Sequence, residues 1–596
     1  MRNDKSLKSQ IFSRRVFILS MLQWIVMLIL ACRMFFLQII KSQDYKTMSD
    51  KNSISIIFVE PERGKVFDRN NVELAISKSC YRLMLYKQRS TNINELAAKL
   101  AKIFDWNEIV LQEYISKMKT APILRPTILS DYVSWQDVCK FEERSSDCEG
   151  VYIDQGLTRE YLFADLFAHV IGYMGVPSKA ETKDYNLSLH KDFKIGKSGI
   201  EKTHERDLIG QFGMKKVEVD AYRTIIREMS QQTSKPGKDL RLTIDRNLQE
   251  YIYQLLKDEW ASATVIDVTN GDILAMVSTP SFNPNLFSKG ISQENWSEIL
   301  NNKSLPLTNK TIAKLYPPGS PFKMAVALAI LQKGINPDQK VFCNGAVELN
   351  GRVFKCWKKS GHGHVNLHQA ITGSCNCYFY VMGLQAGIDN IHDIADQLGI
   401  GSKTNIDLPG EAGGINPDKK WKEKTLSQSW FVGDTINTSI GQGYLLSTPL
   451  QMTMMIARVA SGKLVVPRLI SRIGEKEAAS AEFLDLKINP THLTMVRDGL
   501  ESVINDPKGT SYASRIQEIE MRMAGKTGTA QVISRDTAEN RAAFAKNLQS
   551  HSIFTGYAPA HNPKYACTVV VDHGGWGSGK AAPLARDILR YAQAGA

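Results

Sequence analysis

The sequence contains no compact run of basic residues with aromatic residues between them, although it carries a net charge of +13. Such a charge suits either nucleic acid or an anionic lipid surface, so this absence favours a generally basic surface over nucleic-acid binding. A phosphate-binding loop is also missing. Residues 195–199 resemble one, but a Walker A motif needs a glycine five residues before Gly196, where this chain has Lys191.

A cleavage site for a secretory signal peptide is missing too. Residues 1–15 are polar and basic, and residues 16–40 carry almost no charge apart from Arg33. This length spans a bilayer if Arg33 extends to the interface, and no small-x-small site follows the run. We therefore expect an uncleaved anchor, with a buried core helix as the alternative. The positive residues before it predict a cytoplasmic N-terminus and place the rest of the chain outside.

The remaining chain is long enough for two domains, since 596 residues with 43% hydrophobic content exceed one ordinary domain. Residues 45–235 mix strand and helix patterns without a converging nucleophile and base, and the polar stretch 231–238 is a candidate linker. In residues 240–596, two β-rich runs meet at Asn270-Gly271, which predicts a hairpin. Strand patterns return at 552–557 and 565–571, before a closing helix at 581–592. Strands at both ends with helices between predict an α+β fold whose sheet joins distant parts of the chain.

One serine and one lysine stand out at the head of an apolar, helix-like run. Two prolines and a glycine at 317–319 end the preceding element, Ser320 follows, and Lys323 lies three residues further on. Residues i and i+3 share a helix face, so the Lys323 amine is expected to reach the Ser320 oxygen. A hydroxyl is a poor nucleophile until a base takes its proton, so the pair fits an activated serine. A simple helix cap is the alternative.

Two further motifs complete a known set. Ser374-x-Asn376 and the run Lys526-Thr527-Gly528-Thr529 follow Ser320-x-x-Lys323 within one predicted domain. Penicillin-binding proteins and class A β-lactamases carry this set in this order. The chain resembles a class B penicillin-binding protein over nearly its whole length, and it is most similar to the elongation-type branch, penicillin-binding protein 2. Besides the three motifs, the resemblance rests on the single anchor and on residues 63–70, 357–363, 433–435, 441–444 and 448–451.

The resemblance implies a reaction and a role for each motif residue. Ser320 attacks the penultimate D-Ala carbonyl of a peptidoglycan stem peptide and expels the last D-Ala, and an amine of a neighbouring stem then completes a cross-link. Lys323 is the implied base, and the charge of Lys526 helps to keep its amine neutral. Ser374 passes the proton on, and Asn376 holds the peptide amide and orients Lys323. Other family members have aspartate where Asn376 stands, which changes the local charge.

The third motif and the nucleophile together imply the binding of the donor peptide. Backbone N–H groups of Ser320 and Thr529 form the implied oxyanion hole on an edge strand. The hydroxyls of Thr527 and Thr529, with Lys526 nearby, suit the terminal carboxylate of the donor, and Gly528 belongs to the same strand. Acyl transfer of this kind requires no cofactor. β-Lactams are the implied inhibitors.

A group of cysteines lies close to the second motif. Cys343, Cys356, His362 and Cys375 offer three thiolates and an imidazole, a set that closes a tetrahedral Zn²⁺ site. The spacing is not that of a standard zinc finger, so a disulfide and inert buried thiols remain as alternatives. Substitute ligands are His364, His368 and Cys377. A metal here would be structural and would fix the second motif, because Cys375 is the middle residue of that motif.

The resemblance also implies a place and partners. We expect a single-pass protein of the bacterial inner membrane whose catalytic domain lies in the periplasm. A RodA-type glycosyltransferase and the wider elongation complex are the implied partners, since no glycosyltransferase domain is visible in the chain. Two other functions stay open: a D,D-carboxypeptidase or β-lactamase that uses water as acceptor, and a scaffold whose N-terminal region activates a partner.

Overall fold

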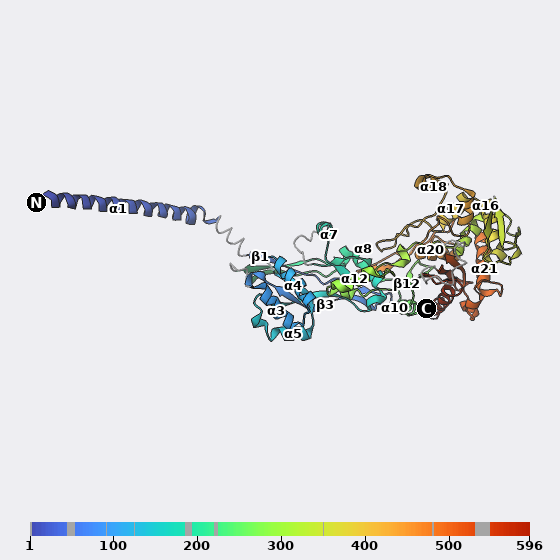
Figure 1. Cartoon of the computed structure of the whole chain (residues 1–596), viewed down its shortest axis with the longest axis horizontal. Coiled ribbons are helices and arrows are strands. Elements are labelled where there is room, and N and C mark those ends of the chain that lie inside the picture. Colours follow the sequence, from blue (N-terminus) through green and yellow to red (C-terminus); the bar gives the residue numbers. More distant parts are fainter. Residues whose placement is uncertain are drawn as a thin grey trace. The chain divides into compact units, whose positions relative to one another are not determined.

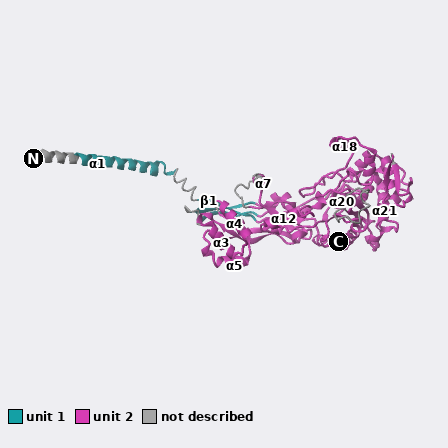
Figure 2. Cartoon of the chain, in the orientation of Figure 1, with its two compact units in different colours: residues 1–61, 211–235 teal, residues 62–210, 236–596 magenta. Residues whose placement is uncertain are grey.

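The computed structural model describes residues 3–43, 54–90, 92–123, 126–184, 193–219, 225–349, 351–479, 482–530 and 549–595. The chain forms two compact units, which Figure 2 colours separately. Unit 1 comprises residues 1–61 and 211–235, and unit 2 comprises residues 62–210 and 236–596.

Unit 1 holds the membrane-spanning candidate. Helix α1 (Asn3–Phe35) continues into a short π-helical turn, η1 (Phe36–Ile40), and Arg14–Ile40 is long and apolar enough to cross a bilayer. Its apolar side chains are exposed, with Trp24 74% accessible, as expected of a surface that faces lipid rather than a protein core. An antiparallel sheet completes the unit, formed by β1 (Ile54–Val59), β8 (Gly213–Val219) and β9 (Ile225–Gln232).

The polar stretch 231–238 is therefore only partly a linker. Gln231 and Gln232 lie at the end of β9, where they pair with Lys215 and Met214 of β8. A polar strand on a small two-sided sheet lacks the buried face that gives strands their alternating pattern, so its sequence looks like a loop.

The N-terminal part of unit 2 is built on a seven-stranded sheet. Strand β10 pairs in parallel with β2, so a strand that follows residue 236 joins strands that precede residue 210. Helices α3 (Ile93–Ile103), α4 (Glu108–Thr120) and α5 (Trp135–Glu142) add a second hydrophobic core beside β3 and β4. The strands are β2 (Val66–Phe67), β3 (Glu73–Leu85), β4 (Thr127–Val133), β5 (Val151–Tyr161), β10 (Leu240–Leu242), β17 (Ile470–Ile473) and β18 (Lys476–Glu477).

A buried network of charges fixes this region. The Arg63 guanidinium donates from Nε to Glu201 at 2.6 Å and from Nη2 to Glu205 at 2.7 Å, and Arg159 donates to the other oxygen of Glu201 at 2.7 Å. Every one of these side chains is at least nine-tenths buried. Two guanidinium groups and two carboxylates balance one another, which is the condition under which charges are tolerated in a protein interior.

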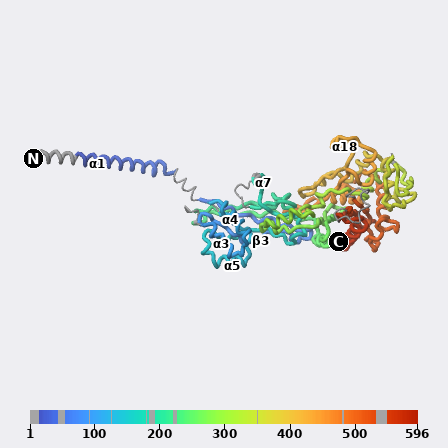
Figure 3. The backbone as a smooth tube through the Cα atoms, viewed as in Figure 1, coloured from blue at the N-terminus to red at the C-terminus, as the bar shows by residue number. Residues whose placement is uncertain are grey.

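The C-terminal part of unit 2 is built on a five-stranded antiparallel sheet in the order β12-β11-β21-β20-β19. The predicted hairpin is confirmed: β11 (Ala261–Asp267) and β12 (Ile273–Thr279) flank a turn in which Gly271 has φ +78°. Strand β11 pairs with β21 (Tyr565–Val571), and β20 (His551–Ala558) lies between β21 and β19 (Ala524–Ala530). Strands from the green and red parts of the chain thus meet in one sheet (Figure 3), and the predicted α+β class is confirmed.

Helices cover this sheet and carry the catalytic segments. Helices α10 (Arg246–Leu256) and α22 (Ala581–Ala594) contact each other and the sheet, and α20 (Pro449–Ser461) packs on β11, β20 and β21 (Figure 1). Helix α14 (Lys323–Gln332) is buried from Lys323 to Leu331. It is enclosed by α16 (Asn376–Ala386), α17 (Ile388–Gln397) and α21 (Pro490–Asn505). An apolar helix of this kind is a rigid base for a reactive side chain at its start.

Candidate active site

Ser320 lies at the first residue of a short 3-10 helix, η6 (Ser320–Phe322), which leads directly into α14. The residue before it, Gly319, has φ +62° and ψ −143°, a conformation that side-chain-bearing residues rarely adopt. The Gly319 N–H donates to the Gly441 carbonyl at 2.9 Å. The Ser320 hydroxyl accepts a hydrogen bond from Ser374 Oγ at 3.2 Å, and the residue is only partly buried. The position therefore presents the hydroxyl instead of using it to cap a helix.

Lys323 is fully buried beneath Ser320. Its Nζ donates to Asn376 Oδ1 at 2.7 Å, to the Ser374 carbonyl at 2.9 Å and to Ser374 Oγ at 3.3 Å. Ser374 Oγ in turn lies 3.2 Å from Ser320 Oγ. The amine thus reaches the Ser320 hydroxyl through Ser374, which gives a continuous path Lys323 Nζ–Ser374 Oγ–Ser320 Oγ.

The turn that holds Ser374 is unusual. Ser374 has φ +53° and connects α15 (Leu367–Thr372) to α16, whose first residue is Asn376. This left-handed conformation costs free energy in a residue other than glycine. In this turn the carbonyl and the hydroxyl of Ser374 both lie within hydrogen-bonding distance of Lys323.

Strand β19 brings the third motif to the same place. It is an edge strand of the five-stranded sheet, and it packs against η6. A Cβ built on Gly528 would lie 2.7 Å from Pro321 Cδ and 2.9 Å from the Pro318 carbonyl, so only glycine permits this approach. A Cβ on Gly319 would lie 3.5 Å from the Thr529 nitrogen. The backbone of Thr529 is therefore next to the nucleophile, as an oxyanion site requires.

Both active-site lysines, Lys323 and Lys526, have lowered pKa values. Burial lowers the pKa of Lys323 from 10.5 to about 8, against an opposing effect of the cysteine thiolates nearby. Burial, and then the charge of Lys323, lower the pKa of Lys526 well below its usual value. Burial is thus the main cause of the lowered pKa of Lys323, and the repulsion between the amines acts on Lys526. Lys526 Nζ has no hydrogen-bond partner among the described residues.

One contact at the site was not predicted. Thr510, in the loop after α21, places its hydroxyl oxygen 3.5 Å from Thr527 Oγ1, and its N–H lies 3.4 Å from the Thr372 carbonyl. It thereby links the segment before Ser374 to the strand of Lys526. No spacing marks Thr510 in the sequence, because the contact arises from the way α21 packs between α15 and β19.

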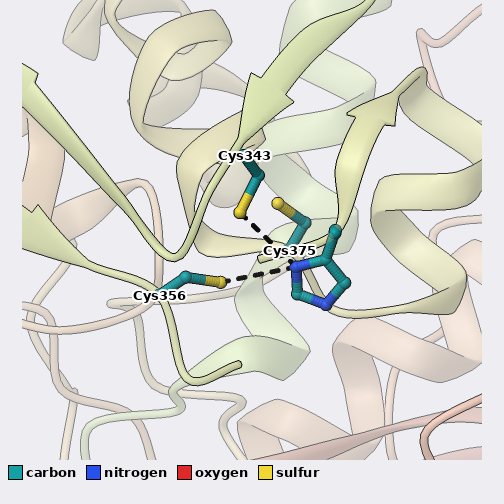
Figure 4. Close-up of side chains that lie close together, drawn as sticks. Cys343, Cys356 and Cys375 are labelled. Carbon is teal, nitrogen blue, oxygen red and sulfur yellow. Dashed lines mark hydrogen bonds between the residues drawn. The ribbon is translucent and has the colours of Figure 1, made fainter. Parts of the chain in front are cut away.

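The predicted cysteine and histidine ligands come together beside the second motif. The ligand atoms of Cys343, Cys356, His362 and Cys375 all lie within 4.8 Å of one another. His362 Nδ1 is 3.6 Å from the sulfurs of both Cys343 and Cys356 (Figure 4). The Asn376 N–H donates to Cys356 Sγ at 3.4 Å, so the cluster also contacts the first residue of α16.

The alternative disulfide and the substitute ligands can each be compared with the structure. All nine cysteines are free thiols, so the structure does not contain the alternative disulfide. His364 is exposed and its ring is tilted against that of Phe342, with centroids 4.9 Å apart, and His368 Nε2 pairs with Ser502 Oγ at 3.1 Å. Cys377 is buried beside the cluster, but it is not among the four residues whose ligand atoms all lie within 4.8 Å of one another.

The electrostatics of the cluster call for a cation. Burial opposes a charged imidazole, yet the hydrogen bonds that the imidazole donates to the cysteine sulfurs raise the pKa of His362 to about 10. The thiol of Cys343 has a lowered pKa because His362 outweighs the effect of burial. A cation is therefore a favourable neighbour for thiolates in this buried pocket, and either an imidazolium or a divalent metal ion can supply it.

Comparison with known proteins agrees with this geometry. The family model of the penicillin binding protein transpeptidase domain matches residues 261–590, and that of the penicillin-binding protein dimerisation domain matches residues 58–242. The peptidoglycan D,D-transpeptidase MrdA of Acinetobacter baumannii is 36% identical over 600 residues, which cover 99% of this chain and 88% of that protein.

Solved structures agree as well. The penicillin-binding protein PBP2 of Helicobacter pylori, in complex with MreC, has a TM-score of 0.80 at 30% identity over 91% of this chain and 99% of that one. A chain of a peptidoglycan synthase complex that coordinates polymerization and crosslinking has a TM-score of 0.71 at 25% identity, over 96% of this chain and 97% of that one. Among the described residues Arg14–Ile40 is the one candidate membrane span, and the match to MrdA covers 99% of this chain, which together support a membrane-anchored protein. The chain belongs to the family of penicillin-binding proteins with a transpeptidase domain and is a relative of the PBP2 and MrdA peptidoglycan D,D-transpeptidases.

Proposed function

We propose that the protein is a serine D,D-transpeptidase that cross-links peptidoglycan stem peptides during elongation of the cell wall, and that penicillins acylate it. The observation that carries the proposal is the hydrogen-bonded path from Lys323 Nζ through Ser374 Oγ to Ser320 Oγ, beside an edge strand. The MrdA relative named above is called a peptidoglycan D,D-transpeptidase.

In the first step, Ser320 Oγ attacks the carbonyl carbon of the penultimate D-Ala. The hydroxyl proton passes through Ser374 to the neutral Lys323 amine, and Ser374 later returns a proton to the departing D-Ala nitrogen. Asn376 Oδ1 accepts from Lys323 at 2.7 Å and thereby fixes the direction of the amine. A base with a pKa of about 8 is well matched to this task near neutral pH.

The oxyanion that forms on the carbonyl oxygen accepts hydrogen bonds from the backbone N–H groups of Ser320 and Thr529. The terminal carboxylate of the donor peptide binds to Thr527 and Thr529, next to Lys526. The buried Lys526 amine has no partner among the described residues, so a carboxylate is a favourable neighbour for it. In the second step an amine of a neighbouring stem attacks the acyl-enzyme, and the ester bond to Ser320 breaks as the new amide forms.

The test is cross-link formation by the full-length protein in detergent, from a donor stem peptide and an acceptor amine. Wild type should form the cross-linked dimer, and Ser320→Ala should form none. Ser360→Ala, an exposed serine in the loop before His362, is the matched control and should retain activity. Cross-linking by Ser320→Ala would refute the proposal. Release of free D-Ala by wild type without any dimer would instead favour the carboxypeptidase alternative.

We further propose that Cys343, Cys356, His362 and Cys375 hold a structural Zn²⁺. With Zn–S bonds of ~2.3 Å and Zn–N bonds of ~2.0 Å, a tetrahedral site separates sulfur from nitrogen by roughly 3.5 Å. The separations of 3.6 Å from His362 Nδ1 to two sulfurs fit this geometry. Four protein ligands leave no open position for water, so the ion would stabilise the second motif and take no part in acyl transfer. Native mass measurement with and without a chelator tests the site.

The anchor and the relatives also support a location and partners. We place the N-terminus in the cytoplasm of a bacterium and residues 45–596 outside the inner membrane, because basic residues precede the span. We assign residues 1–15 to a cytoplasmic tail, 16–40 to the anchor, 45–235 to a pedestal domain and 240–596 to the transpeptidase domain. A membrane-embedded RodA-type polymerase and an MreC-like protein are the proposed partners. The Helicobacter pylori relative is in complex with MreC, and another relative belongs to a peptidoglycan synthase complex that coordinates polymerization and crosslinking.

A further inference from the structure

An indole donates to the catalytic turn from outside the three motifs. Trp357 Nε1 lies 3.1 Å from the Ser374 carbonyl and 3.2 Å from the Gly373 carbonyl. The Ser374 carbonyl also accepts from Lys323 Nζ at 2.9 Å. The Ser374 carbonyl oxygen thus accepts two hydrogen bonds, one from the amine of the proposed general base Lys323 and one from the indole N–H of Trp357. Both of its lone pairs are used, which fixes its direction.

This carbonyl belongs to the strained residue of the site. Ser374 has φ +53°, and serine leaves this left-handed region for ordinary backbone conformations unless its surroundings hold it there. If the turn relaxed, the peptide plane after Ser374 would rotate. The hydroxyl would then leave its position 3.2 Å from Ser320 Oγ. A donor that holds the carbonyl therefore also holds the proton path.

Trp357 is itself held in place by its surroundings. It follows Cys356 directly, and its ring lies edge-on to the His362 ring with centroids 5.5 Å apart. The Tyr380 hydroxyl donates to the Lys355 carbonyl at 3.3 Å, which ties the preceding strand β15 (Arg352–Lys355) to α16. The side chain is 38% exposed, so its burial alone does not account for its presence.

We propose that Trp357 is a positioning residue for the acyl-transfer reaction. Its indole N–H holds the Ser374 carbonyl, keeps Ser374 in its left-handed conformation and so keeps the hydroxyl between Lys323 and Ser320. The inference rests on the proposed function and adds a requirement for the donor N–H itself, beyond the shape of the side chain.

The experiment replaces the N–H and keeps the shape. In the full-length protein, Trp357 is replaced by 3-benzothienylalanine, in which sulfur stands where the indole N–H was, and in parallel by 5-fluorotryptophan, which keeps the N–H. Stopped-flow acylation by a fluorescent penicillin separates the noncovalent Kd from the acylation rate constant. Trp430, whose Nε1 donates to Thr435 Oγ1 at 2.8 Å, receives the same benzothienylalanine substitution as the matched control.

The expected result is specific to one step. Loss of the N–H at position 357 should lower the acylation rate constant about tenfold with Kd and Tm unchanged, because two carbonyls lose a donor only at the catalytic turn. The fluorotryptophan protein and the Trp430 control should react at the wild-type rate. A change of less than about twofold, or a parallel loss in Kd and Tm, would overturn the positioning role. If wild type itself formed no penicillin adduct, the proposed function would fail instead, so the two failures are distinguishable.

Discussion

Replacing Ser374 by alanine removes one oxygen from the centre of the proton path. In the structure this oxygen lies 3.3 Å from Lys323 Nζ and 3.2 Å from Ser320 Oγ. The substitution removes a single buried oxygen, and the Ser374 carbonyl, which accepts from Lys323 Nζ at 2.9 Å, belongs to the backbone and is retained. The variant therefore separates proton transfer from the positioning of Lys323.

The expected loss of acylation rate in Ser374→Ala follows from the proton-transfer role of the hydroxyl. A positioned proton-transfer group accelerates a reaction by a factor of about 10²–10⁴, which corresponds to a lowering of the activation free energy by about 3–5 kcal/mol. Ser374→Ala keeps the nucleophile, the base and the oxyanion donors. We therefore expect the acylation rate constant to fall about 10²- to 10³-fold, while the noncovalent Kd for penicillin changes less than about threefold.

The assay is stopped-flow acylation of full-length wild type and Ser374→Ala, with Ser461→Ala as control. Ser461 donates to the Ala457 carbonyl within α20, and no catalytic residue contacts it. The control should react like wild type. A loss of less than tenfold in Ser374→Ala, at unchanged Tm, would show that the proton reaches Lys323 by another route, and the relay described above would be wrong.

Three further outcomes follow from the structure. Because the base must be neutral and the pKa of Lys323 is about 8, the acylation rate should rise with pH from 6.5 to 9 and level off above; a flat profile over this range contradicts the assignment. His362→Ala should lower Tm and abolish the Tm decrease that a chelator causes in wild type, whereas identical chelator responses would exclude His362 as a ligand. Arg63→Met should destabilise the protein by about 3–5 kcal/mol, measured by denaturant unfolding, because the carboxylates of Glu201 and Glu205 lose a buried partner; a loss below 1 kcal/mol would contradict that account.

Much of the fold could be predicted because its signals are local. The Asn270-Gly271 turn dictates a hairpin by its backbone preference, and the strands on either side are apolar enough to be recognised. The pairing of the polar end of strand β9 was harder to predict. Gln231 and Gln232 are strand residues because β8 lies beside them, and nothing within the stretch itself carries that information.

The candidate site shows the same limit. Motif spacing pointed to Ser320, Lys323 and Ser374, and residue chemistry pointed to the three cysteines and the histidine that the structure brings together. Spacing predicted that the Lys323 amine reaches Ser320, and it did not predict that the Ser374 hydroxyl lies within hydrogen-bonding distance of both residues. Sequence alone could not separate Cys375 from Cys377, because both lie at the start of α16 and both thiols lie beside the cluster.

The contact of Trp357 with the second motif could not be predicted at all. It depends on where the end of β15 meets the turn after α15, which is a property of tertiary packing. The sequence marks Trp357 only as part of a branch-specific run.

The identity of the nucleophile is the central claim, and peptide mapping of the penicillin adduct tests it most directly. Full-length protein is labelled with penicillin and digested, and the modified residue is located by fragmentation mass spectrometry. The account predicts one penicilloyl group, on Ser320, and no adduct in Ser320→Ala. An adduct on Ser374 or any other residue, or an unchanged adduct in Ser320→Ala, would contradict it.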